Sequence, residues 1–269
     1  MTSATRIAIS GATGKMGRML IEAVLAHPQM ALAAALEQPS SPMIGKDAGD
    51  FMGQSSGVAI SADPTAALRA ADVLIDFTRP EATLELLKAC AQHRVRAVIG
   101  TTGFDAAGQS AIAAFSKNNA TVMAPNMSVG VNITLKLLES AGRYLGEGFD
   151  IEVIEAHHRH KVDAPSGTAL KMAEVVAQAA GRNLSKDARY AREGHTGPRP
   201  AKEIGFSVIR GGDIVGDHTV LFAGTGERIE ITHKSSSRAT YAEGALRAAL
   251  FLMQKPAGLY DMQDVLGLK

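Results

Sequence analysis

The chain has 269 residues, 46% of them hydrophobic, and a formal net charge of +1 at pH 7, which is enough apolar content for one large or two modest cores. The balanced charge and the absence of Trp argue against a dedicated nucleic-acid surface. A single cysteine, Cys90, excludes an intrachain disulfide and is typical of a reduced, cytoplasmic protein. No apolar run approaches the roughly 20 residues of a membrane span, and MTSATRIAIS does not resemble a signal peptide.

The first predicted unit is strand, glycine turn and helix: TRIAIS at 5–10, then GATGKMGR, then MLIEAVLAH. Gly11, Gly14 and Gly17 allow a tight turn, close approach of a pyrophosphate and helix–strand packing, although their spacing is not the commonest fingerprint. A second apolar run ends in Glu37, 20 residues after Gly17, where a dinucleotide-binding fold places the acid that binds the adenosine ribose. The alternative is a plain glycine-rich turn with a surface glutamate, which leaves this order unexplained.

The next part of the chain alternates strand and helix signals, which predicts a parallel sheet with helices on its faces. Residues 38–57 are rich in Gly, Ser and Pro and predict a long loop beside the cofactor site, a possible flap. The predicted strands are 73–77, 97–102 and 121–126, and the predicted helices are 80–94 and 105–118.

From residue 129 the pattern changes. A long helix, 129–146, leads into FDIEVIEAHH, and one more helix is expected at 166–180. The polar stretch 181–202 is interpreted as loop. The runs FSVIRGG, HTVLFAG and RIEITHKS predict antiparallel strands joined by glycine turns. The last predicted helix, RATYAEGALRAALFLMQ, is apolar on more than one face and should return to pack on the first domain.

The stretch 155–168, EAHHRHKVDAPSGT, carries the most potential chemistry. Its run of histidines, Arg and Lys can donate protons and attract negative charge, while Ser166, Gly167 and Thr168 would present backbone N–H groups at a helix N-terminus. Together they predict a pocket for a small polyanion that receives protons. A solvated basic edge is one alternative. A metal site is another, but Arg159 and Lys161 would repel a cation and no zinc spacing is present, so no metal is expected.

Taken together, the motifs resemble the dihydrodipicolinate reductase family over nearly the whole chain. The resemblance rests on GATGKMGR, IGTTG at 99–103, APNMSVGVN at 124–132, EAHHRHKVDAPSGTAL at 155–170 and GDHTVLFAGTGERIEITHKSSSR at 216–238. It implies reduction of 4-hydroxy-tetrahydrodipicolinate to tetrahydrodipicolinate by NADH or NADPH, with loss of water, in the diaminopimelate route to lysine. The implied partner is therefore a small-molecule dicarboxylate.

The resemblance also implies residue roles. His157 matches the family's catalytic acid/base and Lys161 its proton donor, while His158, Gly167 and Thr168 match substrate-binding positions and Ser166 stands with them. The positions that match the cofactor site are Gly11, Ala12, Thr13, Gly14, Lys15, Met16, Glu37, Gly100, Thr101, Thr102, Ala124, Pro125, Asn126 and Met127.

One position departs from the family pattern. Gln38 follows the ribose acid where an arginine often grips the 2′-phosphate of NADPH, and Lys15 compensates only in part. We expect use of both cofactors, with NADH at least competitive.

The expected fold is α/β: a Rossmann-like parallel-sheet dinucleotide-binding domain, 1–127 plus 238–269, with an inserted α+β domain, 128–237, for substrate binding and homotetramer formation. A short-chain dehydrogenase is a rival interpretation, but none of the tyrosines begins the Tyr-x-x-x-Lys pair that it needs. A non-catalytic dinucleotide sensor is a second rival, and it leaves His157 to Lys161 unexplained.

Overall fold

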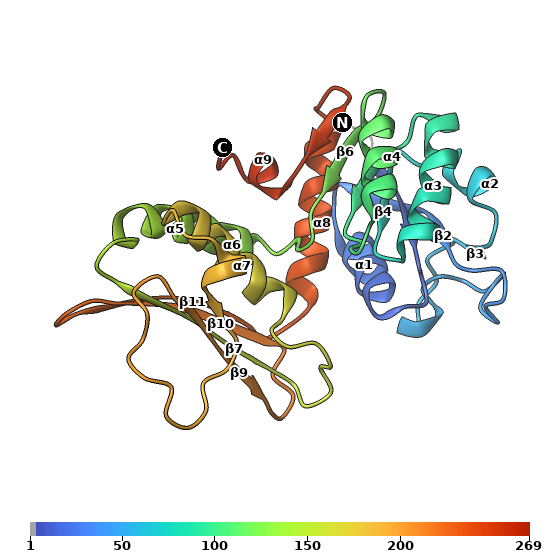
Figure 1. The fold of residues 1–269 in the computed structure, drawn as a ribbon. Coiled ribbons are helices and arrows are strands. Elements are labelled where there is room, and N and C mark those ends of the chain that lie inside the picture. Colours follow the sequence, from blue (N-terminus) through green and yellow to red (C-terminus); the bar gives the residue numbers. More distant parts are fainter. Residues whose placement is uncertain (1–3) are drawn as a thin grey trace. The chain divides into compact units, whose positions relative to one another are not determined.

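The computed structural model describes residues 4–269 and divides them into two compact units (Figure 1). The first unit comprises the described part of Met1–Val129 together with Ala239–Lys269, and the second comprises Gly130–Arg238. The chain therefore passes from the first unit into the second and back again. None of the helices in residues 4–269 has the length and apolar character needed to span a bilayer.

The first unit is built on a seven-stranded sheet in the order β12-β6-β5-β4-β1-β2-β3, with every neighbouring pair parallel. The strands are β1 (Thr5–Ser10), β2 (Met30–Leu36), β3 (Ile60–Ser61), β4 (Val73–Asp76), β5 (Arg96–Ile99), β6 (Ala120–Met123) and β12 (Gly258–Tyr260). All four residues of β4 are buried, as expected for a strand that is covered on both faces.

Helices cover both faces of this sheet. They are α1 (Lys15–Ala26), α2 (Pro64–Leu68), α3 (Pro80–His93), α4 (Ala106–Ser116), α8 (Ala239–Leu252) and α9 (Met262–Leu266), with a short 3₁₀ turn η1 (Asp50–Met52). Residues of α1 and α8 share one core with Ile7 and Ile9 of β1. Residues of α2 and α3 pack with Ala8 on the opposite face. The predicted Rossmann-like α/β fold and the return of the last helix to the first domain are therefore confirmed.

The second unit has a five-stranded mixed sheet in the order β11-β10-β7-β9-β8. Its elements are α5 (Val129–Leu145), β7 (Asp150–His157), α6 (Gly167–Ala179), α7 (Leu184–Asp187), β8 (Ala188–Arg189), β9 (Ile204–Arg210), β10 (Gly216–Ala223) and β11 (Arg228–Ser235). Burial alternates along β7 and β10, which is the signature of a sheet covered on one face. The buried face packs against apolar residues of α5 and α6.

The predicted pairing of the strands in this unit is wrong in one respect. β10 and β11 form the expected antiparallel hairpin. β9, however, pairs parallel with β7, and β10 lies on the other side of β7. The Gly-Asp turn at 212–213 therefore does not join neighbouring strands. The predicted loop 181–202 also contains α7 and β8.

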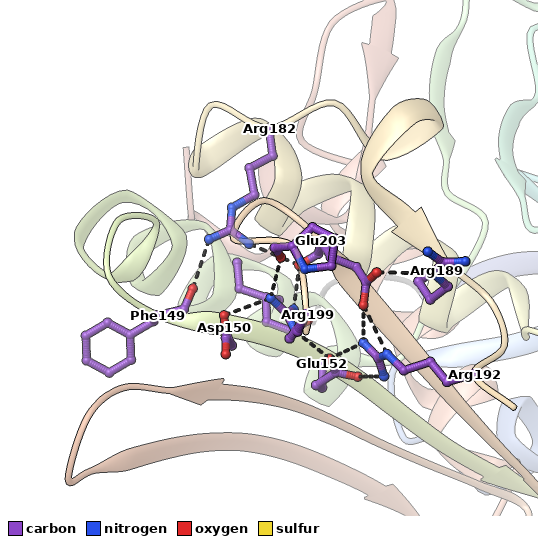
Figure 2. A network of polar contacts seen from close by, with 10 residues as sticks. Phe149, Asp150, Glu152, Arg182, Arg189, Arg192, Arg199 and Glu203 are labelled. Atoms are coloured by element: carbon purple, nitrogen blue, oxygen red, sulfur yellow. Dashed lines mark hydrogen bonds and ion pairs between the residues drawn. The ribbon is translucent and has the colours of Figure 1, made fainter. Parts of the chain in front are cut away.

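An arginine network fixes residues 188–203 on the start of β7 (Figure 2). Arg192 makes a two-pronged contact with Glu152, at 2.7 and 3.0 Å, and also bonds Glu203. Arg199 donates to Asp150, Glu152 and the Ile151 carbonyl. Burial acts to raise the pKa of the Glu203 carboxyl, but hydrogen bonds from Arg192 and Arg189 outweigh it and hold the pKa below its ordinary value. A polar segment without long elements is thus firmly attached.

Candidate active site

The glycine turn lies between β1 and α1, at the carboxyl edge of the parallel sheet. Gly11 has φ +63°, a conformation that favours glycine. A Cβ on Gly17 would lie 2.1 Å from the Gly11 carbonyl oxygen, so this glycine is needed for the helix to approach the turn. Helix α1 begins at Lys15 after Gly14, with no side chain capping it. Its N-terminal N–H groups therefore fit a phosphate group.

Glu37 is held at the end of β2 by this same turn. Its carboxylate accepts hydrogen bonds from the backbone N–H and the hydroxyl of Thr13, at 3.0 and 2.6 Å, and from the N–H of Gln38 at 2.9 Å. Burial acts to raise the pKa of Glu37. These hydrogen bonds together lower it by more, so the net pKa is below its ordinary value. A fixed, charged carboxylate beside the glycine turn is suited to bind ribose hydroxyls.

The long loop after Glu37 is an organised segment. Asp47 accepts hydrogen bonds from Gly49, Ser55, Ser56 and Gly57. Those bonds, led by the Ser56 hydroxyl, hold the pKa of Asp47 well below its usual range. Phe51, in the same loop, lies under the Arg18 guanidinium of α1 at 5.5 Å. The loop is therefore tied both to itself and to the helix that begins at the glycine turn.

One of the predicted residues after β5, Thr101, contacts a buried carboxylate that sequence reasoning missed. Asp76, at the end of β4, accepts from the hydroxyls of Ser10, Thr78, Thr83 and Thr101. The Thr101 side chain is therefore directed at Asp76, and its hydroxyl also accepts from the N–H of Thr78. A Cβ on Gly100 would run into the Phe77 ring. Thr102 is exposed and lies beside them.

The predicted residues after β6 divide into buried and accessible ones. Ala124 and Met127 are buried, and a Cβ on Gly244 of α8 would meet the Met127 carbonyl oxygen, so Met127 lies in the core. Pro125 is exposed and Asn126 half-buried. The carboxyl ends of β1, β4, β5 and β6 face the same edge, and the strand order reverses between β1 and β4. Ligands of open α/β sheets bind at such a reversal.

In the second unit, His157 is the last residue of β7 and has its ring fixed on one side. Its Nδ1 lies 2.6 Å from Oε2 of the buried Glu155. Glu155 also accepts from both terminal nitrogens of Arg210, at 2.7 and 2.8 Å, and from the N–H of Ser166 at 3.0 Å. Within residues 4–269, Nε2 of His157 makes no hydrogen bond. That nitrogen is therefore available to a ligand.

The start of α6 is fixed beside His157. Ser166 caps the helix by accepting from the N–H of Ala169 at 3.1 Å, and its hydroxyl lies 2.9 Å from Nε2 of His218. The Ser166 side chain is thus buried and already hydrogen-bonded. Its predicted role in substrate binding would therefore rest on its place at the N-terminus of α6 rather than on a free hydroxyl. Gly167 is exposed and Thr168 half-buried, at the first turn of a 13-residue helix.

Between His157 and α6, the chain forms a cationic loop. Lys161 Nζ lies 2.8 Å from a carboxylate oxygen of Asp163, and that bond lowers the pKa of Asp163. Burial lowers the pKa of His158, as do the nearby charges of Arg238 and His160. Among the described residues no group of three His, Cys, Asp or Glu side chains can hold a metal ion. This concentration of positive charge favours an anionic ligand.

Sequence reasoning found the residues of this loop but missed the buried groups behind them: Glu155, Arg210 and His218. Glu155 stands two residues before His157 on the same strand, a spacing that places both side chains on one face. Arg210 and His218 come from β9 and β10, which no local pattern connects with β7.

Two family models together match almost the whole chain. The one described as "Dihydrodipicolinate reductase, N-terminus" matches residues 5–127, and "Dihydrodipicolinate reductase, C-terminus" matches residues 130–266. The 4-hydroxy-tetrahydrodipicolinate reductase of Cupriavidus metallidurans is 64% identical over 264 residues, which cover 98% of this chain and 100% of that protein. The enzyme of the same name from Herminiimonas arsenicoxydans is 61% identical, covering 98% of each chain.

Among solved structures, dipicolinate-bound dihydrodipicolinate reductase from Paenisporosarcina sp. TG-14 is similar, with a TM-score of 0.78 and 25% identity over 97% of this chain and 98% of that one. A probable dehydrogenase from Thermotoga maritima, at 12% identity and a TM-score of 0.62 over 97% of this chain and 92% of its own, shares the fold.

Proposed function

Because the chain belongs to the dihydrodipicolinate reductase family and reduces 4-hydroxy-tetrahydrodipicolinate to tetrahydrodipicolinate on the diaminopimelate route to lysine, we propose that His157 and Lys161 handle the protons of this reaction. The observation that carries the proposal is the fixed ring of His157, whose Nδ1 is bound to Glu155 while Nε2 is left to the substrate. Lys161 supplies a second proton donor in the adjoining loop.

The reaction needs a hydride, a proton and neutralisation of two carboxylates. The reduced nicotinamide, when bound, supplies the hydride that replaces the hydroxyl group, and a proton lets that group leave as water. Lys161 and His157 donate and relay this proton. His158 and the N–H groups of Gly167 and Thr168 bind the substrate carboxylates, which the cationic loop attracts. The fixed N-terminus of α6 keeps those groups in place.

The enzyme uses a nicotinamide cofactor, and its glycine turn, Glu37 and the loops after β5 and β6 fit one. We assign binding of this cofactor to Gly11–Met16, Glu37, Gly100–Thr102 and Ala124–Met127. We further propose that NADH is used at least as well as NADPH. The charged Glu37 suits two ribose hydroxyls and repels a 2′-phosphate, and Gln38 adds no opposing charge.

We propose a homotetramer assembled through the second unit. Support comes from apolar residues of its sheet that are left exposed: Val208 and Ile209 of β9 and Ile229 of β11 are 37%, 51% and 40% exposed. Light scattering coupled to size exclusion would measure the assembly, and a monomeric mass would refute it. We also propose a cytoplasmic location. It is supported by the single thiol, Cys90, whose burial raises its pKa to about 12 and keeps it unreactive.

The proton-handling residues are tested by replacement. His157→Ala and Lys161→Ala should each lower kcat by about a hundredfold or more, the scale of a positioned proton donor, with little change in cofactor affinity. The assay follows oxidation of NADH or NADPH with substrate generated in place from pyruvate and aspartate semialdehyde. The exposed His195 and Lys202 provide matched controls, as His195→Ala and Lys202→Ala. Wild-type turnover in both loop variants would exclude these two roles.

A further inference from the structure

Glu155 is the buried centre of the site in the second unit. Its side chain is fully buried on β7, and each carboxylate oxygen accepts two hydrogen bonds. Oε2 takes those from His157 Nδ1 and Arg210, and Oε1 takes those from Arg210 and the Ser166 N–H. Every acceptor position of this carboxylate is thus occupied by a residue of the site or by its own counter-ion.

The pair that Glu155 forms with Arg210 is charged. Burial acts to raise the pKa of Glu155, but the hydrogen bonds from Arg210 and His157 lower it below the ordinary value. An ionised carboxylate can only accept, so His157 Nδ1 must carry the proton that lies between them. The two-pronged contact with Arg210 neutralises the buried charge and fixes the plane of the carboxylate.

Arg210 extends this arrangement to the cationic loop. The nitrogen that bonds Oε1 of Glu155 also donates to the Asp163 carbonyl oxygen at 2.7 Å. Asp163 is the residue whose side chain holds Lys161 Nζ. The loop is further tied to the strand by the N–H of Gly211, which donates to the His157 carbonyl, and by the N–H of Arg159, which donates to Gly212. One ion pair therefore supports His157, the α6 N-terminus and the Lys161 loop together.

We propose that Glu155 and Arg210 are positioning residues of the reductase reaction. Glu155 keeps the proton of His157 on Nδ1, so that Nε2 is the nitrogen that exchanges a proton with the substrate, and Arg210 holds both Glu155 and the backbone under Lys161. This inference rests on the proposed function of His157 and Lys161. Neither Glu155 nor Arg210 has to touch the substrate, because each acts through another residue.

The alternative is that the ion pair only stabilises the fold. The two roles differ in what they change. A purely structural pair would affect the free energy of unfolding and would not decide the tautomer of His157. A positioning pair also decides which ring nitrogen of neutral His157 carries the proton, because an ionised carboxylate can only accept and so keeps that proton on Nδ1. An amide in place of the carboxylate can also donate, so it would allow the proton to move to Nε2.

The decisive variant is Glu155→Gln, which keeps the size of the side chain and removes its charge. We expect kcat to fall about a hundredfold, part of the neutral His157 to carry its proton on Nε2, and the affinity for NADH to stay unchanged. Glu230→Gln, an exposed glutamate on β11, is the matched control and should change none of these. Arg210→Lys keeps the charge but loses the planar fork, and should lower kcat by about tenfold.

A second measurement uses the wild-type enzyme and so does not depend on the folding of a variant. Long-range proton–nitrogen NMR correlations, with His157 assigned from the spectrum of His157→Gln, should show neutral His157 protonated on Nδ1. A proton on Nε2 in the wild-type enzyme, or wild-type turnover in a folded Glu155→Gln enzyme, would overturn the inference. Failure of the proposed function is recognised separately, because His157→Ala and Lys161→Ala would then keep wild-type turnover.

Discussion

His218 is a buried histidine whose charge ties the stability of the second unit to pH. It lies on β10 opposite Glu155 of β7 and His233 of β11. Burial, together with the smaller effect of the neighbouring His157, lowers its pKa from 6.5 to about 4. In the unfolded chain the imidazole returns to its ordinary pKa. Between pH 6.5 and 4 the unfolded state therefore binds more protons than the folded state.

This difference gives stability a predictable sign. The pKa of His218 is lower in the folded state than in the unfolded chain. Its contribution to the free energy of unfolding is therefore fully present above pH 6.5 and is lost as pH falls toward 4. We expect denaturant unfolding to give a lower free energy at pH 5 than at pH 7. His218→Asn should lower stability at pH 7 and flatten its pH dependence. His195→Asn, at an exposed position, should change neither. An equally steep dependence in His218→Asn would show that other groups cause it.

Cofactor choice is also decided at single residues. Gln38→Arg places a planar cation beside Glu37, where a 2′-phosphate would lie, and should shift the ratio of kcat/KM toward NADPH by roughly tenfold, about 1.4 kcal/mol. Steady-state kinetics with both cofactors, at fixed ionic strength, measure the shift. Lys15→Ala in the glycine turn is the companion variant. A wild-type preference for NADPH that survives Lys15→Ala would place the phosphate-binding group elsewhere.

At the scale of elements, the arginine network of Figure 2 imposes a requirement on β9. A Cβ on Gly205 would lie 2.0 Å from Oε2 of Glu152 and 2.4 Å from a terminal nitrogen of Arg192. A glycine in the middle of a strand normally weakens it. Here it makes the room in which the half-buried Glu152 carboxylate and the Arg192 guanidinium meet.

Gly205→Ala should therefore destabilise the second unit. The added methyl forces the Glu152–Arg192 contact apart, and we expect a loss of about 1 to 3 kcal/mol of unfolding free energy. Gly211→Ala is the control, because a Cβ there meets nothing within 4 Å and its backbone is not left-handed. Thermal or denaturant unfolding of both variants gives the comparison. An unchanged unfolding midpoint for Gly205→Ala would mean that the arginine network accommodates the added methyl group without loss of stability.

The elements that the sequence predicted are those with a strong local signal. The fully buried β4 is a continuous apolar run, and the turn before α1 is marked by its glycines. β12, with three residues, has no such signal and was missed. The wrong pairing of β9 has the same cause, because strand order depends on contacts between distant segments, and a glycine turn alone does not show which strands it joins.

The site shows the same division. His157 to Thr168 are close in sequence, so their chemistry was visible in one stretch. The groups that orient them were not: Arg210 meets Glu155 across 55 positions, His218 meets Ser166 across 52, and Ser10 meets Asp76 across 66. Residue types and spacing predict which chemistry is present, whereas the hydrogen-bond partners that orient it depend on the register of distant strands.

At the scale of the whole molecule, the first unit is made of two separate pieces of chain. Helix α8 contributes Ala242, Ala245, Ala249 and Leu252 to the core that contains β1 and α1. β12 extends the sheet beyond β6. The second unit lies entirely within one continuous piece, Gly130–Arg238, and its core draws only on that piece.

Removal of residues 239–269 should therefore unfold one unit and spare the other. Without α8 the first core is open to water, so NADH binding should be lost and residues 4–129 should become sensitive to limited proteolysis. Residues 130–238 should stay protected, with the sheet signature retained in circular dichroism. Intact NADH binding by the shortened chain would show that α8 is dispensable to this core.

The same arrangement sets the order in which a ribosome can complete the protein. The β1 strand and the glycine turn leave the exit tunnel early, yet the core around them lacks α8 until the whole second unit has been made. All residues of the second unit are synthesised before α8, so this unit can fold while the core of the first unit is still incomplete. The residues that are synthesised first thus belong to the part of the enzyme that is finished last.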